Sequence, residues 1–145
     1  EYLDKASQLG IYYTINAAEC NARNKIFHIT GGKMAECAAH IASGEIPVSD
    51  SISFAGRGGR LAIVGRYGCR HELDCSLRPV IENGITVIGV SSGAKNTQVA
   101  VNMLANKAVS VAPLVTGEAG FDDIPRIFEE NADSSSHLKT VIKMD

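Results

Sequence analysis

Three potential metal ligands lie close together in the run CRHELDC, which contains Cys69, His71 and Cys75. Thiolate and imidazole groups suit zinc, but a structural zinc site normally pairs its cysteines as Cys-x-x-Cys. This run contains no such pair, so we do not expect a metal there. The chain does not have the features of a small secreted protein, in which disulfides are common. We therefore expect all four cysteines, Cys20, Cys37, Cys69 and Cys75, to be free thiols.

Glycine-rich turns are the second kind of candidate, because their backbone N–H groups can hold a phosphate. Gly56, Gly58 and Gly59 precede a predicted strand, whereas a dinucleotide-binding loop follows a strand and opens a helix. The stretch GRYG at 65–68 follows a strand but lacks the Gly-x-Gly-x-x-Gly pattern. Either the chain binds no dinucleotide, or the binding loop lies upstream of residue 1.

The elements that would position such residues alternate along the chain. Runs of apolar, aromatic or β-branched residues predict strands at 11–15, 36–41, 60–64, 85–90 and 138–144. Helical spacing of apolar residues predicts helices at 3–9, 16–29, 47–55, 77–82, around 99–104 and around 124–128. Two further segments are expected to be irregular, with a turn at 56–59 and an extended stretch around Pro113.

This alternation predicts an α/β fold with a parallel sheet covered on both faces, because the middle strands are continuous apolar runs. Such sheets bind ligands at the carboxyl ends of their strands. The candidate positions are therefore 41–43, 65–68 and 91–93, although ordinary turns explain the same residues equally well. His40, within a predicted strand, is expected to be a hydrogen-bonded core residue rather than a catalytic one.

Charge and hydropathy exclude several classes of function. The formal net charge is -2, and Lys and Arg are scattered rather than clustered, so neither nucleic acid nor an anionic membrane is an expected partner. The longest apolar runs are too short to span a bilayer, and the polar first residues do not resemble a signal peptide. A cytoplasmic location is expected.

Several stretches resemble the zinc-type alcohol dehydrogenases of the medium-chain dehydrogenase/reductase family. EYLDKASQLGIYYTIN is similar to the family's helix that ends in Lys-Ala-x-x-Leu-Gly before a sheet strand, and AGRGGRLAIVG resembles its RPGGRVVLVG strand. Thr30-Gly31-Gly32 resembles a helix end of that family. KNTQVAVNMLANKAVSVAPLVT, GFDDIPRIFEE and LKTVIKMD are similar to its closing segments, and the order agrees over essentially the whole chain.

The resemblance implies a partial Rossmann-type, doubly wound sheet plus a C-terminal segment of the catalytic domain. Residues 1–94 would be the later part of an NAD(P)-binding domain, and residues 95–145 would return to the catalytic domain. By the same matching, the nicotinamide and ribose of NAD or NADP would lie beside Ser43, Val64, Gly65, Ser91 and Ser92. Lys139 matches a basic residue near the cofactor pyrophosphate, although a solvated surface lysine is an equally good reading.

The family's function implies hydride transfer between an alcohol or carbonyl substrate and the cofactor, with zinc polarising the substrate oxygen. The zinc ligands and the cofactor's phosphate-binding loop would precede Glu1, so we expect this chain alone to be inactive. The sequence also departs from the family at Glu36, which replaces an Asp, and at Ser43, which replaces a Gly.

Two alternatives remain open: a fragment of a zinc-free quinone or enoyl reductase, and a truncated binding module without enzymatic activity. The resemblance further implies a homodimer joined through the apolar strand Ile85–Val90, because an unprotected sheet edge favours pairing with a second copy.

Overall fold

The structure, a computed structural model, describes residues 2–41, 47–64, 76–91, 96–133 and 138–144. The chain divides into two compact units. One comprises Ile15–Thr97, and the other combines residues 1–14 with residues 98–145. Each unit is described by itself.

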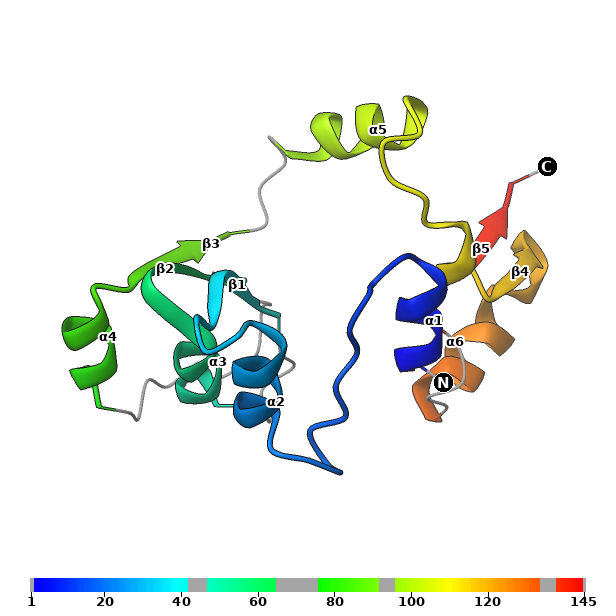
Figure 1. Cartoon of the computed structure of the whole chain (residues 1–145). Helices are drawn as coiled ribbons and strands as arrows, with labels where there is room; N and C mark the ends of the chain where they lie inside the picture. Colours follow the sequence, from blue (N-terminus) through cyan, green and yellow to red (C-terminus); the bar gives the residue numbers. More distant parts are fainter. Residues whose placement is uncertain (1, 42–46, 65–75, 92–95, 134–137, 145) are drawn as a thin grey trace. The chain divides into compact units, whose positions relative to one another are not determined.

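The unit Ile15–Thr97 is built on a parallel sheet of three strands. The strands are β1 (Ala35–His40), β2 (Ala55–Val64) and β3 (Thr86–Val90), and their order in the sheet is β1-β2-β3 (Figure 1). Ala38 lies beside Leu61, and Leu61 lies beside Val87. The α/β class and these three predicted strands are thus confirmed.

Strand β2 begins five residues earlier than predicted, because 56–59 does not form a turn between elements. Ala35 of β1 pairs with Ala55, but Cys37 pairs with Arg60, so the intervening residues of β2 form a bulge within the strand. Gly58 lies inside this bulge with φ +70°, a backbone conformation that glycine adopts without steric cost. Glycine-rich sequence therefore marks an irregular strand here rather than a turn.

Three helices of this unit gather on one face of the sheet: α2 (Ala22–Ile29), α3 (Val48–Phe54) and α4 (Arg78–Asn83). Helix α3 packs against β1 and β2, and both α2 and α4 contact α3. The helices at 47–55 and 77–82 are confirmed within one residue of their predicted bounds. Among the described residues of this unit, no helix provides the predicted cover of the opposite face, and the next helix, α5 (Thr97–Ala105), lies almost wholly in the other unit.

Helix α2 begins six residues later than predicted because two asparagines stabilise two separate local structures, first a turn and then the start of the helix. The Asn16 side-chain oxygen accepts a hydrogen bond from the Ala18 N–H at 3.1 Å, which closes a separate turn. The Asn21 side chain then accepts one from the Asn24 N–H at 2.9 Å and caps the helix.

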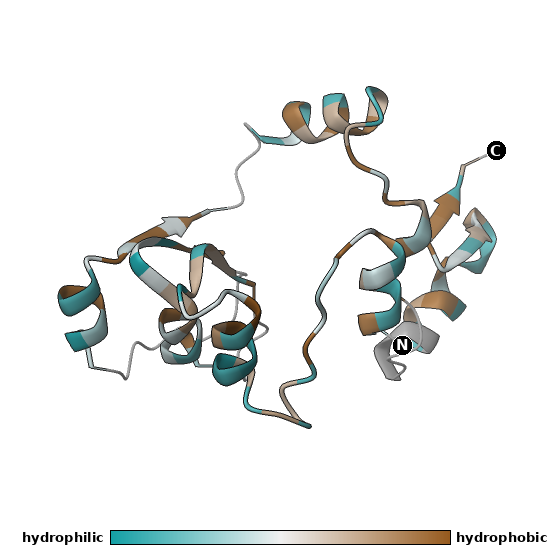
Figure 2. Ribbon diagram, viewed as in Figure 1, coloured by the Kyte–Doolittle hydropathy of each residue, from teal (hydrophilic) through white to brown (hydrophobic). Residues whose placement is uncertain are grey.

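The hydrophobic core of this unit lies between α3 and the sheet. Its buried members are Val48, Ile52, Ala55, Leu61 and Ile85, and the Leu61 side chain is 0% exposed. By contrast, every residue of β3 is exposed, although the strand is apolar (Figure 2). Burial therefore stabilises β2 strongly and leaves β3 as an open edge.

A buried polar contact joins β1 to α3. His40 is 3% exposed and Ser51 8% exposed, and 2.9 Å separates His40 Nδ1 from Ser51 Oγ. Buried polar groups are stable when they are hydrogen-bonded, so the expectation of a hydrogen-bonded core histidine is confirmed.

The second unit contains a small parallel sheet of β4 (Gly117–Gly120) and β5 (Thr140–Lys143). Its helices are α1 (Tyr2–Gln8), α5, α6 (Ile124–Asp133) and the short 3₁₀ turns η2 (Ala112–Leu114) and η3 (Phe121–Asp123). The sheet is anchored by Lys139, whose carbonyl oxygen accepts a hydrogen bond from the Thr116 N–H at 2.9 Å. Strand β5 and helices α1, α5 and α6 match their predicted positions.

Two expectations, for residues 11–15 and for the stretch around Pro113, are wrong, and one strand was not predicted. Residues 11–15 form no strand, and Tyr12 is 87% exposed. A strand needs a hydrogen-bonded neighbour as well as suitable residues, and the described residues provide none for this segment. The stretch around Pro113 is the turn η2, closed by the Leu114 N–H donating to the Val111 carbonyl, rather than an extended segment. Strand β4 was not predicted, because Gly and Glu are poor strand formers.

Helix α1 ends as its sequence predicts. Gly10 has φ +91°, and the Ile11 N–H donates to the Ala6 carbonyl, which is a common glycine-dependent helix end. None of the helices in the described ranges combines the length and the apolar character that a membrane crossing requires.

Our first prediction concerns the ion pair across β4 and β5, in which Lys143 Nζ lies 2.6 Å from Glu118 Oε2. The hydrogen bond from Lys143, and then its charge, lower the pKa of Glu118. The pair's contribution to stability should be present above the ordinary glutamate pKa and lost as the pH falls through the lowered one. NMR titration of Glu118 should show this lowered pKa, and K143M should return it toward the ordinary value. The control K107M should leave it unchanged, and an unshifted Glu118 in the unmodified chain would contradict the assignment.

Our second prediction concerns the buried contact between His40 and Ser51. S51A removes a hydroxyl from the Nδ1 atom of a buried ring, and we expect a loss of about 1–3 kcal/mol in the free energy of unfolding. The matched control is S53A on the same helix, whose hydroxyl donates to the Asp50 carbonyl within that helix. Urea denaturation should show the loss for S51A and about 0.5 kcal/mol or less for S53A. Equal stabilities would show that the contact does not hold α3 on β1.

Candidate functional site

The carboxyl ends of the three parallel strands form one edge of the sheet in the unit Ile15–Thr97. In the register of the sheet, His40 lies beside Ile63, and Val64 lies beside Val90. Ser91 directly follows β3, so the structure brings Val64 and Ser91 to the same edge, at the ends of neighbouring strands. We call this the carboxyl edge.

Of the predicted cofactor contacts, Val64 and Ser91 are described at this edge, and they differ in surroundings. The Val64 side chain is half-buried, and Ser91 is exposed. A half-buried apolar residue offers a surface for a flat ring, and an exposed hydroxyl can hydrogen-bond to a sugar hydroxyl. These residue types fit the nicotinamide and ribose of a dinucleotide. Their contact with a cofactor stays a prediction.

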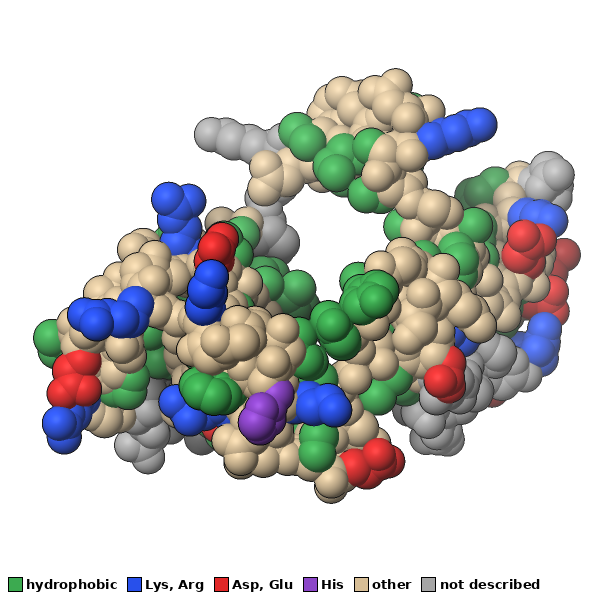
Figure 3. All heavy atoms as spheres, in the orientation of Figure 1, with side chains coloured by type: hydrophobic (Ala, Val, Ile, Leu, Met, Phe, Trp, Pro, Cys, Tyr) green, Lys and Arg blue, Asp and Glu red, His purple; other side chains and the backbone are tan. Residues whose placement is uncertain are grey.

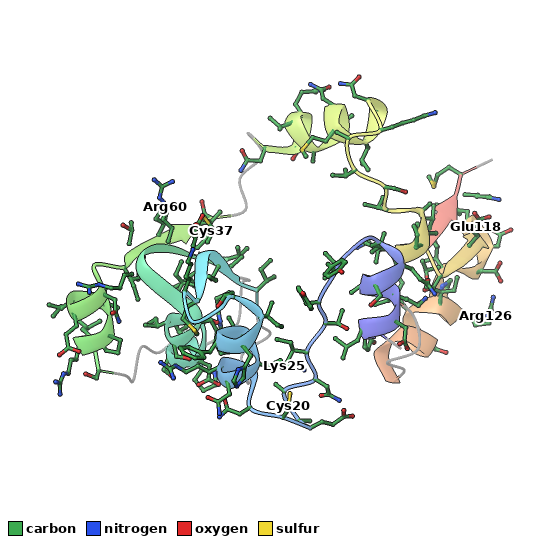
Figure 4. All side chains as sticks on the ribbon, in the orientation of Figure 1. Cys20, Lys25, Cys37, Arg60, Glu118 and Arg126 are labelled. Atoms are coloured by element: carbon green, nitrogen blue, oxygen red, sulfur yellow. The ribbon has the colours of Figure 1, made fainter. Side chains whose placement is uncertain are left out.

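Three other predicted site residues, Ser43, Gly65 and Ser92, lie outside the described residues. So do the stretch at 66–68 and the candidate metal ligands Cys69, His71 and Cys75. Within the described ranges, no three His, Cys, Asp or Glu residues come together as metal ligands. Of the cysteines in these ranges, Cys20 and Cys37 are free and exposed, and Figure 4 labels both.

Lys139 lies in the other unit, immediately before β5, and its residue is exposed. Its backbone carbonyl also accepts a hydrogen bond from the Gly117 N–H at 3.3 Å, so the backbone of Lys139 positions the start of β4. The structure describes no ion pair for its side chain. The predicted role of that side chain beside the cofactor pyrophosphate remains a prediction.

Sequence reasoning recognised His40 as a core residue but missed its partner. Ser51 lies eleven residues away on α3, and no motif connects the two positions. The contact places a polar pair just inside the carboxyl edge, where it fixes α3 against the end of β1. A signal was present only in composition: a histidine at the apolar end of a strand (Cys37–His40, CAAH) requires a hydrogen-bond partner if it is buried.

Comparison with known proteins identifies the family of this chain. A family model described as zinc-binding dehydrogenase matches residues 1–108. An uncharacterized zinc-type alcohol dehydrogenase-like protein of Haemophilus influenzae is 24% identical over 143 residues, which are 99% of this chain and 40% of that protein. Sorbitol dehydrogenase of Bacillus subtilis is 27% identical over 116 residues, which are 80% of this chain and 33% of that protein.

The fold agrees with these sequence relationships. A crystal structure of an Escherichia coli oxidoreductase/dehydrogenase of unknown specificity, involved in membrane biogenesis, superposes with a TM-score of 0.84 at 24% identity. The match covers 99% of this chain and 41% of that one. This chain therefore spans between 33% and 41% of the length of these three proteins. Because the family model covers most of the sequence, the chain belongs to the zinc-binding dehydrogenase family of medium-chain, zinc-type alcohol dehydrogenases.

Proposed function

We propose that this chain is the cofactor-positioning part of an oxidoreductase that transfers hydride between an alcohol or carbonyl substrate and NAD or NADP. The observation that carries the proposal is the carboxyl edge, where Val64 and Ser91 end neighbouring parallel strands in a chain of the zinc-binding dehydrogenase family. Members of this family use NAD(H) and zinc.

The residues of this chain would bind and orient the cofactor rather than perform a chemical step. Val64 would support one face of the nicotinamide ring, and the Ser91 hydroxyl would hydrogen-bond to its ribose. Ser43, Gly65 and Ser92 would complete that contact, and Lys139 would lie near the pyrophosphate. The cofactor would supply hydride chemistry at this edge, and zinc would supply Lewis-acid polarisation of the substrate oxygen.

The two parts of the sequence would have separate roles. Residues 1–94 would supply the later strands and helices of the NAD(P)-binding domain, and residues 95–145 would return to the catalytic domain. The three-stranded parallel sheet within Ile15–Thr97 supports the first assignment. The family match favours a zinc-dependent parent over a zinc-free quinone or enoyl reductase or a binding module.

Our third prediction is that the 145-residue chain alone has no dehydrogenase activity. The sequence contains no complete dinucleotide-binding glycine pattern, and its described residues form no metal-ligand cluster. The assay is formation of NADH or NADPH from the oxidised cofactors with a panel of primary, secondary and polyhydric alcohols. Hydride transfer by the purified chain would contradict the prediction.

The matched positive arm is a fusion in which the part of the Haemophilus influenzae relative that precedes the matched segment stands before residue 1. We expect this fusion to reduce the cofactor and a zinc chelator to abolish the reaction. A folded, zinc-containing fusion that transfers no hydride to NAD or NADP would overturn the proposed function.

We also propose a homodimer joined through the β3 edge, Ile85–Val90. Within the described ranges, strand β3 pairs with β2 and with no other strand, and Val87, Ile88 and Val90 are all exposed large apolar side chains. Such an edge presents unpaired backbone groups and apolar surface to a second copy.

Our fourth prediction is that I88K shifts the chain from dimer to monomer in sedimentation, because each copy brings an ammonium group to the shared edge. The matched control is I81K on α4, where an isoleucine of the same unit is 77% exposed but lies outside β3. A dimer that persists in I88K, or a monomeric unmodified chain, would contradict the edge-strand interface.

A further inference from the structure

A cavity of about 490 Å³ lies at the end of the sheet opposite the carboxyl edge. Lys33 and Met34, which directly precede β1, line it together with Ala55, Gly56 and Arg57 at the start of β2. Because β1 and β2 are parallel, these residues mark the amino ends of the strands. The remaining wall comes from α2, α3 and the region of α4, and we call this cavity the amino-end pocket.

Three cationic side chains line the amino-end pocket, and each comes from a different element. Arg23 belongs to α2, Lys33 to the turn before β1, and Arg57 to the bulge of β2. Within the described residues, no ion pair or side-chain hydrogen bond engages any of the three, and no Asp or Glu lines the pocket. Three positive charges in the wall of one pocket, without a described counter-charge, favour the binding of an anion there.

Neutral hydrogen-bonding groups complete the polar part of the wall. They are the hydroxyl groups of Ser49 and Ser76 and the amide of Asn83, whereas the Ser53 hydroxyl donates to the Asp50 carbonyl. Figure 3 shows Lys and Arg side chains spread over the surface of this unit, so positive charge alone does not distinguish the pocket. The pocket is distinguished by its concavity, by the presence of three cations and several neutral polar groups in one wall, and by the absence of a described acidic residue from that wall.

The rest of the lining is apolar. Phe27 contributes an aromatic ring, Ile52 belongs to the buried core, and Pro79 covers another side. A ligand that fits both kinds of wall needs an anionic group for the cations and a ring for the apolar surface. The guanidinium groups of Arg23 and Arg57 can each donate two parallel hydrogen bonds to a phosphate. A carboxylate is a poorer partner for several cations because it has fewer acceptor oxygens than a phosphate.

We propose that the amino-end pocket binds a small organic phosphate, a phosphate ester that carries an aromatic or heterocyclic ring. Arg23, Lys33 and Arg57 hold the phosphate, and Phe27 and Pro79 contact the ring. The volume suits a ligand of roughly nucleotide size, since small-molecule sites usually enclose about 300–1,000 Å³. The pocket lies at the opposite ends of the strands from the carboxyl edge, so this proposal does not depend on the proposed function.

Titration of the ¹⁵N-labelled 145-residue chain with phenyl phosphate tests the proposal. We expect saturable binding, with the largest amide shifts at residues 32–34 and 55–57. Inorganic phosphate should bind more weakly because it lacks the ring, and phenol should not produce these shifts because it lacks the charge. Equal binding of inorganic phosphate and phenyl phosphate would overturn the ring contact, and the absence of saturable shifts would overturn the site.

Two matched pairs of variants locate the phosphate. R23Q and R57Q should each weaken phenyl phosphate about tenfold, the effect of losing one charge-assisted contact. K25Q on the same helix and R60Q on the same strand remove cations that are also exposed but do not line the pocket, and both residues are labelled in Figure 4. These controls should bind like the unmodified chain. The proposal fails if R23Q and R57Q bind as tightly as their controls, or if all four variants weaken binding equally.

Discussion

Parallel pairing of β1, β2 and β3 is the constraint on which the rest of the described architecture depends. It forces each connection between strands to cross over the sheet, and the crossovers supply α3 and α4. It also brings all three carboxyl ends to one edge and all three amino ends to the other. If β2 and β3 were antiparallel, Val64 and Ser91 would lie at opposite edges of the sheet, and no shared site could form between them.

Burial and pairing are distributed unevenly over this sheet. The central strand β2 combines two hydrogen-bonded neighbours with a fully buried Leu61, whereas β3 has one neighbour and exposed side chains. The hydrogen bond between His40 and Ser51 adds a directional contact to a core that is otherwise apolar. The described structure is therefore most rigidly specified around α3 and least around β3, where apolar surface remains for another element or chain.

The predictions from sequence succeeded where local pattern and tertiary environment agree. The strand at 60–64 is a continuous apolar run that is buried, and the helix after Pro47 presents Val48 and Ile52 to the core. The predictions failed where the presence or absence of a neighbouring strand decides whether a segment forms a strand. Residues 11–15 have the composition of a strand but no described strand beside them, and β4 has a strand neighbour but a composition that disfavours strands.

The candidate site was predictable only in part, for the same reason. Alternation of strands and helices locates the carboxyl edge, so the positions of Val64 and Ser91 follow from strand ends. The residues of the amino-end pocket are separated in the sequence by up to sixty positions, from 23 to 83, and share no motif. Only the packing of the helices and strand starts in the folded chain brings these residues together. In the sequence, Lys and Arg are scattered, so the presence of three cations in one pocket could not be predicted.

The most direct test of the central claim is to locate the nicotinamide ring relative to the carboxyl edge. We would measure intermolecular nuclear Overhauser effects between NADH and the methyl groups of the fused, zinc-containing protein. The account predicts contacts from the nicotinamide protons to the Val64 methyl groups. Contacts to the ring of Phe27 in the amino-end pocket, with none to Val64, would contradict it.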